Sequence, residues 1–231
     1  MNTNVNLAAP LGVLALLGTA LVITVAVICL LDSLIVSRAA HGLLARLSML
    51  TILIVGGLYL GALLVFAFAS SDKVLARGSE KHFCEIDCHL AYSIVDVKPT
   101  KTIGNGPQQV SAAGLFNVVT IKTRFDETTI SAHRGNGQLY PNSRTLSVID
   151  DRGRQYLPAT LAQKALELSG AAGAPLTTPL RPGESYTTSV VFDLPADAKN
   201  PTLLLNEGDW LTHLVIGHEN SPLHKQTRFQ L

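Results

Sequence analysis

The stretch that decides the fold is "LRPGESYTTSVVFDLPADAKNPTLLL", residues 180–205. Its apolar side chains alternate with polar ones and share one face of an extended chain: Tyr186, Val190, Phe192 and Leu194, with Thr188 between them. A period of two residues predicts a β-strand with one buried face. The turn signals "RPGE" and "LPADAKNP" bound this strand, and "TLLLN" after them predicts a second one.

The same alternation extends toward the amino terminus. In "LFNVVTIKTRF", residues 115–125, one face carries Leu115, Val119, Ile121 and Phe125, with Asn117 and Thr123 as exceptions. The segment "RTLSVIDDRGRQYLPA", residues 144–159, predicts a strand, a D-D-R-G turn and another strand. "HLAYSIVDVK" and "LTHLVIG" are further candidate strands.

One segment has a different period. "TLAQKALELSG", residues 160–170, places Leu161, Ala165 and Leu168 at helical spacing and ends in a glycine, which is typical of a helix terminus. We expect a short helix that bridges two strands. The strands and this helix together predict an antiparallel β-sandwich with a helical crossover.

From about residue 89 to residue 205, the chain resembles a family of bacterial exported immunoglobulin-like domains, mostly of uncharacterised function. The shared elements occur in the family's order: "AYSIVDVK", "VVTIKTRF", "LSVIDDRGRQYLP" and the Pro-Gly-Glu to Phe-Asp-Leu-Pro segment at 182–195. The resemblance implies an immunoglobulin-like sandwich outside the cytoplasm and no shared catalytic residue. The chain departs from the family in its apolar amino-terminal region, its cysteine pair and its histidine-containing tail.

Two apolar runs precede this domain. No charged residue occurs from Leu11 to Leu31 or from Leu47 to Ser70. Each run is long enough to cross a hydrocarbon core of about 30 Å as a helix. The leading "MNTNVNLAAP" has no Lys or Arg, which argues against a cleaved signal peptide. The runs predict a transmembrane hairpin.

The charges that flank the hairpin predict its orientation. The connection between the runs carries Arg38 and Arg46, whereas Lys73, Arg77 and Lys81 follow the second run. A count of positive residues on the two sides therefore does not decide the orientation, but large domains are exported largely regardless of charge. We expect a two-pass protein of the bacterial inner (cytoplasmic) membrane, with its carboxy-terminal domain in the periplasm.

The sequence thus divides into six expected parts. They are an N-terminal tail (1–10), transmembrane helix 1 (11–36), a basic cytoplasmic loop (37–46), transmembrane helix 2 (47–71), a polar tether (72–81) and an exported β-sandwich domain (82–231).

The second apolar run contains a G-x-x-x-G pattern formed by Gly57 and Gly61. Small residues at this spacing allow helix backbones to approach closely in lipid. The two glycines are candidates for helix packing, either between the two helices of the hairpin or against another membrane protein.

The segment "HFCEIDCH", residues 82–89, contains Cys84 and Cys88. An exported domain lies in an oxidising compartment, which favours a disulfide between them. An extended strand would separate positions four apart by about 13 Å, so a disulfide requires a turn just before the strand that starts near Leu90.

A metal site is the alternative. His82, Cys84, Cys88 and His89 offer the nitrogen and sulfur ligands that copper or zinc prefers, and the tail contains His213, His218 and His224. A two-helix anchor before an exported β-domain also resembles oxidase subunit II, whose copper site uses Cys-x-x-x-Cys. The histidine of that signature is replaced by Tyr92, and no methionine lies nearby. The spacing is one residue too long for haem attachment.

These features favour a non-enzymatic, membrane-anchored accessory or structural subunit, whose sandwich contacts partner subunits. A respiratory or photosynthetic electron-transfer complex is one possible host. The alternatives are a metal- or redox-active domain centred on Cys84 and Cys88, and an envelope sensor or ligand-binding module. A net charge of +1 gives no electrostatic support for nucleic-acid binding. The first interpretation requires no cofactor.

Overall fold

The computed structural model describes residues 2–3, 9–35, 39–83, 89–129 and 134–231. The chain divides into two compact units. A sandwich unit contains Met1–Asn4, Asp72–Trp210 and Gln226–Leu231, and a helical unit contains Val5–Ser71 and Leu211–Lys225. The carboxy-terminal part of the chain therefore leaves the sandwich unit and returns to it for the last strand.

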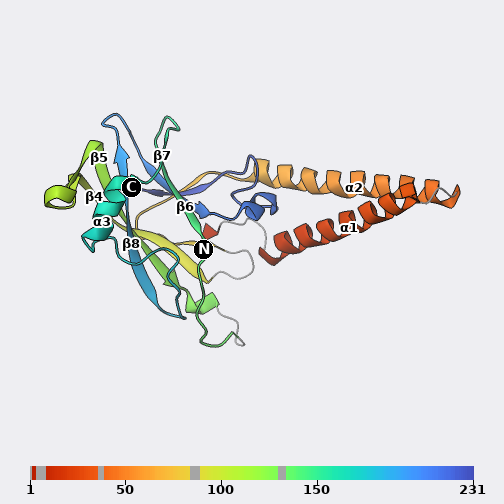
Figure 1. Ribbon diagram of the computed structural model, residues 1–231, viewed down its shortest axis with the longest axis horizontal. Helices are drawn as coiled ribbons and strands as arrows, with labels where there is room; N and C mark the ends of the chain where they lie inside the picture. Colours follow the sequence, from red (N-terminus) through yellow and green to blue (C-terminus); the bar gives the residue numbers. More distant parts are fainter. Residues whose placement is uncertain (1, 4–8, 36–38, 84–88, 130–133) are drawn as a thin grey trace. The chain divides into compact units, whose positions relative to one another are not determined.

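The helical unit is built on two long helices that lie side by side (Figure 1). Helix α1 spans Ala9–Ile35 and α2 spans Ala39–Ala69. The expected apolar helices are present, but the expected loop at 37–46 is wrong, because most of it belongs to α2. Its Ala, Leu and Arg residues are strong helix formers, so the helix extends through them.

The sandwich unit has two five-stranded sheets (Figure 1). The first contains β1 (Asn2–Thr3), β3 (Lys81–Phe83), β4 (Leu90–Ile103), β5 (Val110–Phe125) and β8 (Ser185–Leu194), in that order. The second contains β2 (Lys73–Leu75), β10 (Thr227–Gln230), β9 (Thr202–Glu207), β6 (Arg144–Ile149) and β7 (Gln155–Tyr156). The sandwich is confirmed, but its sheets are mixed, because β1–β3 and β2–β10 are parallel pairs.

The core between the sheets follows the alternation in the sequence. Fully buried side chains at Val119, Ile121 and Phe125 on β5 meet Val190 and Phe192 on β8. The second sheet contributes Leu75, Val148, Leu203, Leu205 and Phe229. Thr123, the expected exception on β5, is also fully buried.

A second, smaller core covers the outer face of the first sheet. Helix α3 (Thr160–Leu168) buries Ala162, Ala165 and Leu166 against residues such as Phe116 and Val191. The helix is confirmed, and Ala165 is buried as expected, but Leu161 and Leu168 were wrongly placed on the buried face, because both are exposed. Two alanines face the sheet because small side chains let a helix approach it closely.

Two further expectations were wrong. The segment 72–81 is not a free tether, since β2 pairs with β10 and Lys81 begins β3. The segment "LTHLVIG" is not a strand: Trp210–Leu214 forms the 3₁₀-helix η3, followed by turns. Two other 3₁₀-helices are η1 (Gly106–Gln108) and η2 (Glu127–Thr129).

A buried group of charges links the two sheets. Lys81 is fully buried, and its Nζ donates to the carbonyl oxygens of Leu205 at 2.7 Å and Thr227 at 3.1 Å on the opposite sheet. Arg144 and Glu207 are directly opposed on β6 and β9 and form a salt bridge with both side chains buried. The Arg144 guanidinium lies 4.0 Å from the Phe83 ring centroid.

Arg144→Met should destabilise the sandwich by about 3 kcal/mol, because it leaves the Glu207 carboxylate buried without its cross-strand partner. Arg144→Met combined with Glu207→Leu should be less damaging than the two single losses added together. Denaturant unfolding of the full chain in mild detergent measures both effects.

The matched control is Arg152→Met, which removes an ion pair to Asp197 in which both side chains are more than half exposed. Its effect should stay below about 1 kcal/mol. Equal losses from Arg144→Met and Arg152→Met would contradict a special role for the buried pair.

Candidate functional site

A polar cluster lies on the outer face of the first sheet. Register places His82, Ala91 and Arg124 in one row across β3, β4 and β5. Ala91 has almost no side chain, so the longer side chains on either side can approach each other above it. Asp126 follows directly after β5, and Glu80 precedes β3.

The cluster is closely hydrogen-bonded. Nε2 of His82 lies 3.0 Å from Oδ2 of Asp126. Arg124 donates from Nε and Nη2 to the two carboxylate oxygens of Glu80, both at 2.8 Å, and its Nη2 lies 3.4 Å from Oδ2 of Asp126. Thr128 donates from its backbone N and its hydroxyl to Oδ1 of Asp126, at 3.1 and 2.7 Å.

These contacts keep both carboxyl groups ionised. Burial by itself raises the pKa of Asp126, but hydrogen bonds from Thr128 and His82 and the charge of Arg124 outweigh it, so this pKa lies well below its usual value. The bidentate hydrogen bond from Arg124 lowers the pKa of Glu80. The same pairing with Glu80 raises the pKa of Arg124.

The cluster also contains potential metal ligands. One ligand atom from each of Glu80, His82 and Asp126 lies within 4.8 Å of the others. Arg124, however, already supplies a positive charge to both carboxylates, so a metal ion would have to displace it. The arrangement is better described as an internal ion network than as a preformed metal centre.

One atom of this cluster has no partner in the network. Nδ1 of His82 is buried and accepts or donates no hydrogen bond among the described residues. A histidine whose other nitrogen is held by a carboxylate is oriented as metal-bound histidines commonly are. His82 therefore retains one ligand position that faces away from Asp126.

The remaining predicted ligands are only partly placed. Cys84 and Cys88 lie outside the described residues, so their disulfide stays a prediction. His89 is buried, its ring is 5.0 Å from that of Phe125, and its carbonyl oxygen accepts a 2.6 Å hydrogen bond from the Asp126 backbone. The tail histidines His213, His218 and His224 all belong to the helical unit, whereas His82 and His89 belong to the sandwich unit.

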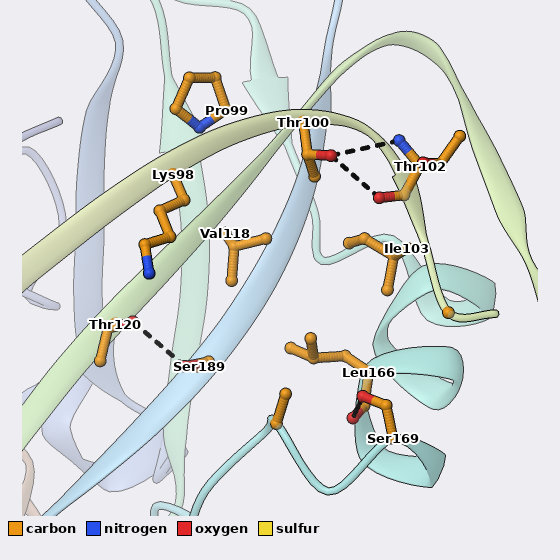
Figure 2. Close-up of a pocket in the computed structure, with 12 residues that line it drawn as sticks. Lys98, Pro99, Thr100, Thr102, Ile103, Val118, Thr120, Leu166, Ser169 and Ser189 are labelled. Atoms are coloured by element: carbon orange, nitrogen blue, oxygen red, sulfur yellow. Dashed lines mark hydrogen bonds between the residues drawn. The ribbon is translucent and has the colours of Figure 1, made fainter.

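A groove between α3 and the first sheet is a second candidate site (Figure 2). Its volume is about 460 Å³. Its apolar lining includes Ile103, Val118 and Leu166, and its hydroxyl groups come from Thr100, Thr102, Thr120, Ser169 and Ser189. Lys98 is the charged residue at this groove.

Sequence reasoning missed this groove. The sequence feature that could have indicated it is the alternation of side chains along two strands. On β4, Lys98, Thr100 and Thr102 take successive outward positions, and on β5, Val118 and Thr120 do the same. Thr120 lies directly opposite Ser189, and their hydroxyl oxygens are 3.1 Å apart. Short hydroxyl side chains beside a helix leave space that larger side chains would fill.

Comparisons with known proteins do not assign the chain to a family. No family model matches it, and no curated protein matches it. A secreted protein from Mycobacterium tuberculosis, MPT63, has 13% identity and a TM-score of 0.39, over 70% of this chain and 100% of that one. A conserved hypothetical protein from Bacillus anthracis has 12% identity and a TM-score of 0.37, over 51% of this chain and 82% of that one.

Asp126→Asn should destabilise the sandwich near pH 7 by about 1–3 kcal/mol, because it removes a charged acceptor shared by His82, Thr128 and Arg124. The pKa of Asp126 is lowered by folding, so its contribution is present above the unfolded pKa of about 4 and is lost as the pH falls toward the folded value. Unfolding measured from pH 7 down to pH 3 should therefore show a smaller acid-induced loss in the variant.

The control for this experiment is Asp96→Asn, which affects a carboxylate that is 3.7 Å from the exposed Lys98. This variant should keep the acid dependence of the parent chain. A parent-like acid dependence in Asp126→Asn would instead show that the network does not set acid stability.

Proposed function

We propose that the chain is a two-pass, membrane-anchored, non-enzymatic accessory subunit whose sandwich contacts partner proteins outside the cytoplasm. The observation that carries the proposal is the exposure of both long apolar helices. Their candidate spans, Leu11–Ile35 and Gly42–Ala69, have mean hydropathies of 2.8 and 2.5. In the most apolar stretch of each span, only 6% and 11% of the residues are buried, respectively.

Such helices are suited to lipid and poorly suited to water. A core helix of a soluble domain would bury its apolar side chains, whereas Leu14, Leu21, Leu53 and Leu58 are each more than half exposed. Large continuous apolar surface of this kind marks a membrane or protein partner. A cleaved leader would account for one such helix, and α2 would still need an apolar environment.

The positive residues that flank the helices are evenly divided between their two ends. Of the three cations that follow α2, Lys81 is buried in the sandwich and hydrogen-bonded there. Lys73 and Arg77 therefore remain as flanking charges on the sandwich side, against Arg38 and Arg46 on the other. The balance is even by count, and the proposed export rests on the expectation that a large domain crosses largely regardless of charge.

The edges of the sandwich favour contacts through faces and loops. At one edge of the second sheet, β7 has two residues, and at the other, β2 has three. In the first sheet, the edge strand β8 is partly covered by bridges to Pro158 and Gly173. Short or covered edges resist the addition of a foreign strand. Partner subunits would then bind to loops or to the outer face.

The groove beside α3 supports a second candidate function, an envelope ligand-binding module. Its volume of about 460 Å³ falls within the usual range of small-molecule sites. The apolar residues and the hydroxyl groups would suit a small, mainly apolar ligand with hydrogen-bonding groups. The metal- or redox-active alternative has narrower support, namely the buried Nδ1 of His82.

Protease added to membrane vesicles tests the proposed topology. In spheroplasts, which expose the periplasmic face, protease should digest the sandwich once it is unfolded by mild heat. In inverted vesicles, the sandwich should remain protected under the same treatment. Digestion in inverted vesicles only would reverse the orientation and remove the basis for a periplasmic partner.

Gly61→Leu tests whether α2 contacts a partner in the membrane. Apart from the backbone of α2 itself, a side-chain atom added at Gly57 or Gly61 would meet no atom of the described residues within 4 Å, so neither glycine packs against the described part of α1. The larger side chain should therefore leave the folded sandwich unchanged and reduce co-purification of partner subunits in mild detergent.

The control is Gly18→Leu on α1, where an added atom likewise meets none of the described residues outside the helix within 4 Å. Retained partners in Gly61→Leu would remove this surface of α2 from consideration. Equal loss of partners in both variants would indicate a general effect of bulk on the hairpin.

A further inference from the structure

Residues 211–225 form a folded segment of the helical unit. The hydroxyl of Tyr59 on α2 donates to the carbonyl oxygen of Leu214 at 2.5 Å. A side-chain atom added at Gly12 on α1 would lie 3.1 Å from both Val215 and Ile216. The backbone N of Lys225 donates to the hydroxyl of Ser70 at 2.8 Å. The segment is therefore attached to both helices.

The attachment to α2 lies inside the apolar span. Tyr59 precedes the end of α2 at Ala69 by ten residues, which is about 15 Å along a helix. The apolar surface continues past this point, because Leu60, Val65 and Phe68 are each more than 60% exposed. The segment around Leu214 thus lies alongside the part of α2 that favours lipid, rather than beyond its end.

The segment exposes three leucine side chains and buries four polar residues. Leu211, Leu214 and Leu223 are 46%, 39% and 64% exposed. In contrast, the buried polar residues are Thr212, His218, Glu219 and Ser221. Val215 and Ile216 are buried as well, and His213 and Lys225 are exposed. The surface of the segment therefore combines three leucines with a histidine and a lysine, which suits the boundary between acyl chains and headgroups.

The polar groups of the segment are largely satisfied within it. Three backbone N–H groups donate to the carbonyl oxygen three residues earlier: Val215 to Thr212, His218 to Val215 and Ser221 to His218. The hydroxyl of Ser221 donates to the carbonyl oxygen of Val215, and the side-chain amide of Asn220 donates to the hydroxyl of Thr212. Internal satisfaction of this kind is required where water is scarce.

Leu223 adds an independent indication. Its φ is +65°, in the left-handed region that leucine rarely adopts. The strained backbone therefore carries an exposed leucine, and burial in the described core does not offset the strain. A strained residue is often retained at a binding surface.

We propose that residues 211–225 form an interfacial element on the non-cytoplasmic side of the bilayer, with Leu211, Leu214 and Leu223 in contact with lipid acyl chains. Its partner is the bilayer itself. Trp210, the first residue of η3, is 67% exposed and belongs to a residue type enriched at the headgroup level. The inference rests on the proposed membrane span.

Trp210 makes the test direct, since it is the single tryptophan of the chain. The full chain is reconstituted into phosphatidylcholine vesicles that carry bromine at shallow or deep acyl positions. We expect blue-shifted Trp210 emission, stronger quenching by shallow bromine than by deep bromine, and weak quenching by iodide in water. Emission like that of tryptophan in water, with quenching by iodide alone, would overturn the inference.

A variant with Leu211→Asn, Leu214→Asn and Leu223→Asn should shift the emission to the red and raise iodide quenching several-fold. The control carries Leu161→Asn and Leu168→Asn, two leucines of α3 that are 73% and 61% exposed, and should behave as the parent chain. If the triple variant fails to fold by circular dichroism, bromine quenching in the parent chain still decides the outcome.

Two further readouts separate this inference from the function on which it rests. Release of the chain from vesicles by alkaline carbonate would contradict the membrane span itself. A chain that resists carbonate but shows iodide-quenched Trp210 would overturn only the interfacial element. Emission that depends on the protein-to-lipid ratio would instead assign the surface to a second copy of the chain, and would also overturn the proposal.

Discussion

The sandwich depends on how it accommodates charge in its interior. Lys81 extends from the first sheet to carbonyl oxygens of the second, and Arg144 and Glu207 are paired across two neighbouring strands. Hydrocarbon contacts tolerate several registers between two sheets, but a buried lysine can meet those carbonyls in few arrangements. The charged group therefore supports one alignment of the sheets, while the apolar core supplies most of the free energy of folding.

The outer face of the first sheet also pairs charged side chains, and there the pairing forms a hydrogen-bonded network around His82. Arg124 neutralises Glu80 and contacts Asp126, which in turn holds Nε2 of His82. The single cation of Arg124 faces both carboxylates, and hydrogen bonds from Thr128 and His82 further stabilise Asp126, so neither carboxylate requires a metal ion to stay ionised. Among the described residues, Nδ1 of His82, two residues before Cys84 in the sequence, has no hydrogen-bond partner.

The strand pattern could be predicted because a period of two assigns each residue to one of only two faces. Val119, Ile121, Val190 and Phe192 were placed correctly for that reason. The face of α3 could not be, since residues 161, 165 and 168 and residues 162, 165 and 166 both fit a helical period. Only the sheet beneath decides between them, and it favours small alanines. The polar cluster was also beyond prediction, because β4 pairs with β3 on one side and with β5 on the other, and so brings Asp126 to His82 across 44 positions of sequence.

The pairing of β2 with β10 has a consequence for the order of assembly. β2 lies shortly after α2 in the sequence, whereas β10 spans Thr227–Gln230. During synthesis, β2 therefore remains without this partner until β10 has been made. The segment 211–225 joins the helical unit just before β10 joins the sandwich unit. The two compact units are thus completed one directly after the other, and a ribosome that stops before residue 211 would leave β2 unpaired and the helices without this segment.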